Sequence, residues 1–158
     1  MSKIYLKPMT AAEFEAWRVP NQENYAQEKE KEGLSPEDAR AVAEKSFREL
    51  LPEGSASPDQ YVSLAVEAGT DLVVGAIWWG VQKHGSRRVA WVYSIDIDAA
   101  HRGKGYGRAA MLAAEAEVRA KGFDRFGLHV FGYNKVARNL YQSLGFDETN
   151  VVMYKDLK

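Results

Sequence analysis

The middle of the chain carries a repeating pattern of apolar and polar positions that is typical of β-strands. Residues 61–68 alternate between the two classes with a period of two, as a half-buried strand does. Residues 72–81 and 89–97 are nearly continuous apolar runs rich in β-forming residues, and short polar turns separate these segments. The pattern predicts three antiparallel strands joined as a meander. Further strands are predicted at residues 4–8, 126–131 and 151–157.

Helix signals occupy the segments between these runs. Thr10, followed by Glu13 three residues later, is typical of a capping box at the start of a helix. Ser35 and Pro36, followed by acidic residues, predict the start of a second helix. Apolar residues then recur at helical spacing from a glycine-rich segment to Gly122, where a helix is expected to end. Helices are therefore predicted from residue 11, over 36–51, up to 122 and over 135–144.

The order of these elements predicts the fold class. Two helices follow the first strand, the meander comes next, and helices and strands then alternate to the end. An antiparallel meander that continues through helical crossovers implies a mixed, mostly antiparallel sheet with helices on both faces. We therefore expect an α/β (α+β) fold with a central sheet of about six to seven strands flanked by about four helices. The length of 158 residues predicts that residues 1–158 form a single domain.

Composition narrows the classes of function. The apolar fraction of 46% and the charged fraction of 27% are those of globular proteins, and they exclude disordered, collagen-like and coiled-coil classes. The net charge of -1 excludes the positive field of a nonspecific nucleic-acid binder. Cysteine is absent and the three histidines are widely spaced, so we expect no metal site. The first residues lack a secretory signal and no apolar run reaches membrane-spanning length, which predicts a cytoplasmic protein without a membrane partner.

The segment that follows the meander has the features of an anion-binding site. Three glycines alternate with larger residues directly before a predicted helix, so backbone N–H groups converge where the helix dipole favours negative charge. Basic side chains beside these glycines add positive charge. We therefore expect a phosphate group to be bound by Arg102, Gly103, Lys104, Gly105, Tyr106, Gly107 and Arg108.

Two common nucleotide-binding motifs fit this segment poorly. A Walker loop places Ser or Thr directly after its Gly-Lys pair, whereas Gly105 follows Lys104 here. A dinucleotide-binding fingerprint opens near the first strand of a parallel βαβ unit, whereas this segment follows several antiparallel strands. A simple phosphate or nucleotide binder stays as one alternative reading of the loop.

A known family carries two motifs that match this chain in order and spacing. Its Arg/Gln-x-x-Gly-x-Gly/Ala loop is matched by Arg102, Gly105 and Gly107. Its following strand and helix are matched at Asn134, Ala137, Tyr141, Gly145 and Phe146. From about residue 89 to the C-terminus the chain therefore resembles the GNAT superfamily of acyl-CoA-dependent N-acyltransferases.

This resemblance implies a V-shaped opening where the fourth strand splays from the fifth, with acetyl-CoA bound there as cosubstrate and no metal. The pantetheine arm would pair with the fourth strand around Ile95 and Ile97, almost as an added strand. The pyrophosphate would meet the backbone of the glycine-rich loop. Asn134 would contact the pantetheine region, cap the following helix, or do both.

The implied reaction moves the acetyl group directly to an amine in a ternary complex. It needs a neutral amine, a stabilised oxyanion and a proton for the departing thiolate. The resemblance gives Tyr141 the role of proton donor, and packing of the helix is the alternative. His129 and Asp96 are competing candidates for the general base, since a histidine titrates near neutral pH and a carboxylate would lie beside the thioester. Strand alternation, or a bulge, decides which face Asp96 takes.

The acceptor amine is the part of the function that the sequence specifies least. Acidic residues near Tyr25 either attract a cationic amine or form a solvated helix face; they are Glu23, Glu28, Glu30 and Glu32. We expect an N-acetyltransferase that acts on an amine of a small molecule or a peptide, and the resemblance is compatible with a homodimer. The alternative from another class is a non-catalytic GNAT-like protein that senses acyl-CoA.

Overall fold

The computed structural model describes residues 3–158. Met1 and Ser2, which the predicted domain 1–158 includes, lie outside the described residues. Within residues 3–158, five strands form one sheet in the order β1-β2-β3-β4-β5. Neighbouring strands are antiparallel except for β5, which runs parallel to β4. The strands are β1 (Ile4–Pro8), β2 (Gln60–Glu67), β3 (Val73–His84), β4 (Arg87–Ile97) and β5 (Phe126–Leu128).

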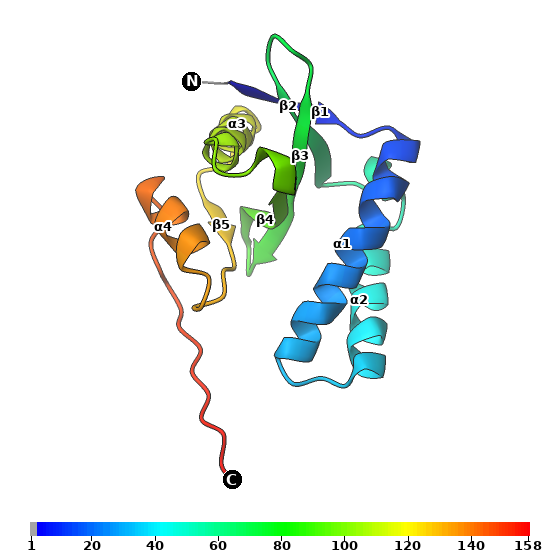
Figure 1. Cartoon of the computed structure of the whole chain (residues 1–158), viewed down its shortest axis with the longest axis vertical. Helices are drawn as coiled ribbons and strands as arrows, with labels where there is room; N and C mark the ends of the chain where they lie inside the picture. The colour runs from blue at the N-terminus through cyan, green and yellow to red at the C-terminus, as the bar shows by residue number, and fades with distance from the viewer. Residues whose placement is uncertain (1–2) are drawn as a thin grey trace.

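Four α-helices flank this sheet, with α1 and α2 on one side and α3 and α4 on the other (Figure 1). The predicted class, a mixed and mostly antiparallel sheet between helices, is confirmed. None of the helices in the described part of the chain is long and apolar enough to cross a membrane. The helices are α1 (Ala11–Lys31), α2 (Pro36–Leu50), α3 (Tyr106–Ala120) and α4 (Lys135–Ser143).

Two adjacent tryptophans anchor the helix layers to opposite faces of β3. Trp78 lies in a buried cluster with Trp17 of α1 and Phe47 of α2. Trp79 lies in a second buried cluster with Met111 of α3. Consecutive side chains on a strand point to opposite faces, so one dipeptide serves both layers of the core. The two indoles are 4% and 0% exposed, and such large rings supply much of the apolar area that folding buries.

The predicted helix starts are confirmed by their hydrogen bonds. The backbone N–H of Thr10 donates to Oε1 of Glu13 over 2.9 Å, and the N–H of Glu13 donates to Oγ1 of Thr10 over 3.2 Å. This reciprocal pair is a capping box. Ser35 accepts from the N–H of Asp38 over 3.1 Å, and α2 then begins at Pro36.

A β-bulge at Tyr93 sets the faces of the second half of β4. Trp78 pairs with Ser94 while Trp79 pairs with Val92, so Tyr93 is one residue in excess. Paired residues on an antiparallel ladder point to the same face, and a bulge shifts the alternation by one. Ser94 therefore lies on the Trp78 face, which α1 and α2 cover. The same alternation places Asp96 on that face, while Ile95 packs against the clusters below α3.

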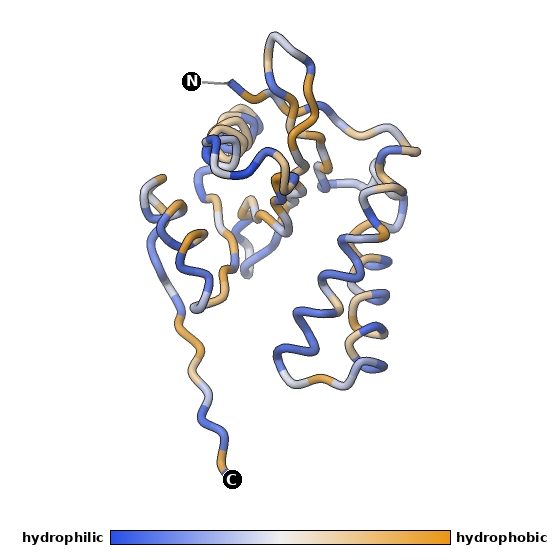
Figure 2. The backbone as a smooth tube through the Cα atoms, viewed as in Figure 1, coloured by the Kyte–Doolittle hydropathy of each residue, from blue (hydrophilic) through white to orange (hydrophobic). Residues whose placement is uncertain are grey.

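The predicted strand at residues 151–157 is not confirmed, which leaves five strands where six to seven are expected. Residues 147–158 contain no helix or strand, and Figures 1 and 2 show them running away from the body of the molecule as an extended tail. β5 is also shorter than predicted, because it ends at Leu128 and not at residue 131. A strand needs a neighbour for its hydrogen bonds, and the tail has no strand beside it among residues 3–158.

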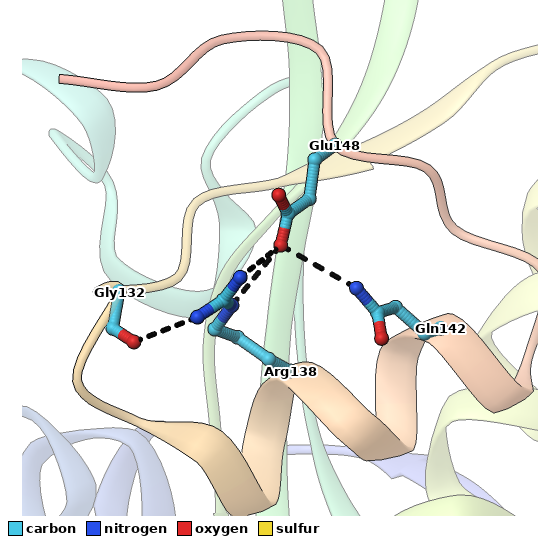
Figure 3. Close-up of polar contacts among 4 residues, drawn as sticks. All are labelled: Gly132, Arg138, Gln142 and Glu148. Atoms are coloured by element: carbon cyan, nitrogen blue, oxygen red, sulfur yellow. Dashed lines mark hydrogen bonds and ion pairs between the residues drawn. The ribbon is translucent and has the colours of Figure 1, made fainter.

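The root of this tail is held by α4. Arg138 donates from Nε to Oε1 of Glu148 over 3.0 Å and from Nη1 to the carbonyl oxygen of Gly132 over 2.9 Å (Figure 3). Gln142 donates to the same carboxylate oxygen over 3.4 Å. One guanidinium therefore joins α4 to the loop after β5 and to the start of the tail.

Candidate functional site

The ladder between β4 and β5 is short. It pairs Ala90 with Phe126, Trp91 with Gly127 and Val92 with Leu128, and it then stops. Residues 93–97 continue as strand without a partner on the β5 side among the described residues. An unpaired strand edge carries N–H and C=O groups that suit an extended, amide-containing ligand. The predicted V-shaped opening stays a prediction, and this edge is the feature that bears on it.

The glycine-rich loop connects β4 to α3 and presents unpaired backbone donors. Gly103 and Gly105 have φ values of 76° and 81°, the left-handed region that glycine adopts most readily. Gly105 stands at the N-cap of α3. Within residues 3–158 no acceptor receives the backbone N–H groups of Gly103, Lys104, Gly105, Gly107 or Arg108. Converging free N–H groups at a helix N-terminus form a site for an anion, and phosphate is the natural guest.

The basic side chains of the loop differ in their contacts. Arg102 donates from Nε to the carbonyl of Ile97 over 2.8 Å, and its Nη2 lies 3.2 Å from Oδ1 of Asp96. Arg108 donates to Oγ of Ser143 over 2.8 Å and so connects α3 to α4. Lys104 is exposed and forms no ion pair with an acidic group in the described chain, which leaves its charge available to a bound anion.

Tyr106 is part of the hydrophobic core. Its ring is 8% exposed and lies in a buried cluster with Val74 and Ala110, and its hydroxyl donates to the carboxylate of Glu67. The side chain therefore fixes the first turn of α3 against the sheet. The sequence predicts Tyr106 as one of the phosphate-binding loop residues. Its side chain instead holds the start of α3 in place.

Tyr141 projects from α4 into a half-buried position. Its ring contacts Phe146 edge to face, with 5.9 Å between the ring centres. Burial raises the pKa of its hydroxyl, so the group keeps its proton at neutral pH. None of the residues in the described part of the chain forms a hydrogen bond with this hydroxyl. Both packing and proton donation, the two roles weighed from the sequence, are open to a residue so placed.

Asn134 occupies the N-cap of α4. Its Oδ1 accepts from the backbone N–H of Ala137 over 3.2 Å, which is the capping role weighed from the sequence. The Asn134 side chain is exposed, and its amide Nδ2 takes part in no hydrogen bond within residues 3–158. The nitrogen is therefore available to a ligand while the oxygen holds the helix.

His129 and Glu28, on two separate elements, are near enough for their charges to interact. Glu28 lies near the end of α1 and His129 directly follows β5. Partial burial raises the pKa of the Glu28 carboxyl group, and the positive charge of His129 acts against that rise. Lys31 of α1 also approaches this loop, since its Nζ lies 5.9 Å from the centre of the Tyr133 ring. The end of α1 and the loop between β5 and α4 therefore form opposite sides of one region.

The two candidate bases, Asp96 and His129, have different surroundings. Asp96 is exposed and paired with Arg102, whereas His129 packs edge to face on Phe131 at 5.0 Å and interacts with Glu28. No hydrogen bond or ring contact joins Asp96, His129 and Tyr141 to one another within residues 3–158. The sequence does not distinguish Glu28 from its acidic neighbours. No local signal could have done so, because the group that interacts with Glu28 lies on a distant segment of the chain.

Asn21 links that face of α1 to β4. Its Nδ2 donates to the carbonyl of Trp17 over 2.8 Å, and its Oδ1 accepts from Oγ of Ser94 over 3.2 Å. The helix contains Pro20, which cannot donate a backbone hydrogen bond, and the side-chain bond from Asn21 to Trp17 lies in the same turn. Because Asn21 and Glu28 share a face, Glu28 is directed along the same side of the sheet as Ser94.

The chain matches one family along most of its length. Residues 13–146 fit the family described as Acetyltransferase (GNAT) family. The chain belongs to the GNAT acetyltransferase family. Its N-acetyltransferase relatives include YycN of Bacillus subtilis (strain 168), which is 35% identical over 155 residues, 98% of this chain and 99% of that protein. YdgE of the same organism is 31% identical over 96% of this chain and 97% of its own length.

Solved structures agree with this membership. The crystal structure of YycN from Bacillus subtilis superposes on this GNAT chain with a TM-score of 0.88 over 99% of each chain. A complex of aminoglycoside N-acetyltransferase AAC(6')-Iy with CoA superposes with a TM-score of 0.63 over 100% of this chain and 97% of that one. At 17% identity, this second likeness shows the fold alone.

No group of three or more His, Asp or Glu side chains that could hold a metal ion is found among the residues described.

Proposed function

We propose that this GNAT chain moves an acetyl group from acetyl-CoA directly to an amine of a small molecule or peptide, in a ternary complex. The observation that carries the proposal is the set of free N–H groups at the start of α3, directly after the unpaired half of β4. Together they offer a pyrophosphate site and an amide-binding edge in sequence along the chain, which are the two parts that an acyl-CoA ligand requires.

The residues present fit this cosubstrate. The backbone of residues 103–108 would hold the pyrophosphate, with Lys104 adding positive charge and Arg102 held at its border by Asp96. The backbone around Ile95 and Ile97 would pair with the pantetheine amides. When bound, acetyl-CoA supplies the activated acetyl group as a thioester.

Tyr141 is our candidate for the proton donor. Its buried hydroxyl keeps its proton because burial raises its pKa, and no protein group in the described chain competes for that proton. A hydroxyl in this state can give a proton to a departing sulfur. The ring contact with Phe146 holds the side chain in one orientation on α4.

His129 is the better placed of the two candidate bases. It is exposed, it stands beyond the end of the β4–β5 ladder, and the carboxylate of Glu28 is near enough to interact with the positive charge that it carries once it has accepted a proton. Asp96 is already engaged by Arg102 and fits a role in orienting that guanidinium. An amine entering between α1 and the loop after β5 would meet both Glu28 and His129.

Relatives support an amine of a small molecule as the acceptor. Mycothiol acetyltransferase of Thermobispora bispora is 34% identical over 89% of this chain, which spans 45% of that protein. Aminoglycoside N-acetyltransferases share the fold. Both names describe acetyl transfer to compounds of low molecular mass, and the chain's own acceptor is proposed to belong to this broad class.

Calorimetry and a thiol-release assay test the proposal. Acetyl-CoA and CoA are expected to bind, because the proposed site interacts with both a pyrophosphate and the amides of a pantetheine arm. ATP has no such arm and is not expected to bind. Release of free thiol is then measured across polyamines, amino acids, aminoglycosides and peptide N-termini. Binding without release across that panel would favour the acyl-CoA sensor, and binding of ATP in preference to CoA would favour a nucleotide binder. Failure to bind CoA removes the proposal.

A further inference from the structure

The backbone of the glycine-rich loop has little local structure to fix it. Glycine stands at positions 103, 105 and 107, and glycine permits more backbone conformations than any other residue. Of the two side chains between these glycines, Lys104 is exposed, whereas Tyr106 is 8% exposed and reaches the core. The N–H groups of Gly105 and Gly107, for which residues 3–158 provide no acceptor, flank Tyr106 directly. The position of these donors therefore depends on what holds the Tyr106 side chain.

A carboxylate from a distant part of the chain holds the Tyr106 hydroxyl. The hydroxyl donates to Oε2 of Glu67, a residue 39 positions earlier at the end of β2. The Tyr106 ring lies in a buried cluster with Val74 and Ala110, so the hydrogen bond is partly shielded from water. A hydrogen bond to a charged acceptor is stronger than one between neutral groups. Glu67 therefore helps to fix the first turn of α3 against the sheet.

Glu67 is itself held in place at the end of β2. Its Oε1 accepts from Oγ1 of Thr70 over 2.8 Å, and its backbone N–H donates to the carbonyl oxygen of Leu72 over 2.8 Å. On the other side of β2, Glu67 pairs with Ile4 of β1. The two carboxylate oxygens thus receive separate donors, one from the β2–β3 turn and one from α3. A carboxylate held in this way can orient the tyrosine that binds it.

The two ends of the loop have contacts of their own, which are more exposed. Arg102 donates to a backbone carbonyl of β4, and Arg108 donates to a serine hydroxyl of α4, each over 2.8 Å. Both hydrogen bonds are exposed to solvent, where water competes for the same groups. The bond between Tyr106 and Glu67 lies between these ends and is part-buried. It is therefore expected to be the firmest attachment of the loop.

We propose that Glu67 is a positioning residue for acetyl-CoA. Through Tyr106, it holds the backbone donors of the glycine-rich loop in the arrangement that binds the pyrophosphate. The inference rests on the proposed function, because it concerns the affinity of that same site. Donors held in advance bind an anion more tightly than donors that must first be ordered. Loss of the Tyr106–Glu67 bond therefore weakens binding of the pyrophosphate and leaves binding of the pantetheine arm unchanged.

Dissociation constants for two ligands test the inference. Glu67→Leu removes the acceptor, so the affinity for acetyl-CoA, measured by calorimetry, is expected to fall about fivefold. S-acetylpantetheine has the pantetheine arm without the pyrophosphate, and its affinity, measured by NMR titration, is expected to be unchanged. Glu67→Gln keeps an oxygen that can accept from the tyrosine, and it is expected to bind acetyl-CoA within about twofold of the wild type. An equal loss of affinity for both ligands in Glu67→Leu would assign the residue to stability alone and overturn the inference.

Tyr5→Phe is the matched control. The Tyr5 hydroxyl donates to Oδ1 of Asp71 over 3.0 Å, so this variant also removes a hydrogen bond from a tyrosine to a carboxylate near the end of β2, but one that does not involve α3. Its affinity for acetyl-CoA is expected to equal that of the wild type. In a Tyr106→Phe background, Glu67→Leu is expected to have no further effect, because the two residues act through one bond. Additive losses in the double variant would show that Glu67 does not act through Tyr106.

Amide chemical shifts separate a failure of this inference from a failure of the proposed function. In the protein without ligand, Glu67→Leu is expected to move the amide resonances of Gly105 and Gly107, whereas Tyr5→Phe is not. Resonances that stay in place overturn the inference whatever ligand the loop binds. A wild type that does not bind acetyl-CoA overturns the proposed function. A wild type that binds it, together with a Glu67→Leu variant that binds it equally well, overturns the inference alone.

Discussion

Arg102 and Asp96 form an ion pair at the point where β4 passes into the glycine-rich loop, with Nη2 3.2 Å from Oδ1. The same guanidinium donates to the carbonyl of Ile97 over 2.8 Å. Arg102 is thereby turned back along the strand, and its position depends on Asp96. Asp96, one of the two bases considered from the sequence, is thus linked by a direct contact to the loop that we propose holds acetyl-CoA.

Asp96→Asn is expected to raise the KM for acetyl-CoA about two- to fivefold and to leave kcat within about twofold, because an exposed ion pair contributes little energy. Steady-state kinetics with varied acetyl-CoA measure both constants. The pH dependence of kcat should keep its acidic limb in this variant. Loss of that limb would instead identify Asp96 as the general base.

Tyr141→Phe is expected to lower kcat about 100-fold or more, because the proposed proton donor is removed while the ring stays. The variant should bind acetyl-CoA as the wild type does, by calorimetry. Its free energy of unfolding should stay within about 1 kcal/mol of the wild type, since the hydroxyl makes no hydrogen bond in the described chain. Wild-type turnover in this variant would assign Tyr141 to packing alone.

His129→Ala is expected to raise the pKa of Glu28 further. Burial already raises it, and the charge of His129 is the largest influence acting in the other direction. A pH titration of the Glu28 carboxyl carbon by NMR measures the change, and His84→Ala on the β3–β4 turn is the control. An unchanged titration would mean that the two groups do not interact in solution.

The same titration has a consequence for stability. A carboxyl group whose pKa is higher in the folded protein destabilises the fold as pH rises through the unfolded and then the folded value. Glu28→Gln removes this penalty. The variant is therefore expected to match the wild type in acid and to be the more stable of the two near neutral pH, by denaturant unfolding.

Gly105→Ala tests the geometry of the loop. With φ at 81° an added side chain is strained, although its Cβ meets no atom within 4 Å, so a loss of about 1 kcal/mol in stability is expected. Relaxing that strain moves the free N–H groups, and the affinity for acetyl-CoA should fall about tenfold, which is the loss of one hydrogen bond to a charged group.

Gly33→Ala is the matched control for this change. Gly33 follows α1 with φ at 110°, and a Cβ added there would also meet no atom within 4 Å, so its cost in stability should be similar. Its affinity for acetyl-CoA should equal that of the wild type. Equal losses of affinity in the two variants would show that the loop is not the binding site.

The sequence predicts those features of the fold that depend on local signals. Thr10 with Glu13 and Ser35 with Pro36 mark helix starts that the structure confirms, because their hydrogen bonds join residues a few positions apart. The glycine-rich loop is readable for the same reason. The strand at residues 151–157 is expected from alternation alone, and alternation does not reveal whether a neighbouring strand is present.

Contacts between distant parts of the chain are the features that the sequence does not predict. The approach of Glu28 to His129 joins α1 to the segment after β5, and nothing in either segment identifies the other. The pairing of Asp96 with Arg102 depends on which face Asp96 takes, and that depends on the bulge at Tyr93. A single extra residue in one strand can be recognised only from its pairing with the neighbouring strand, here the pairing of β4 with β3.

The extra residue, Tyr93, divides β4 into two halves whose side chains have different roles. Before Tyr93, the alternation serves the packing of the core, and after it, the same strand presents Ser94 and Asp96 toward α1. Removing one residue here would exchange the faces of everything up to the loop and would place Asp96 among the apolar side chains beneath α3. For variation in this protein, the length of β4 is therefore a stricter constraint than the identity of most of its side chains.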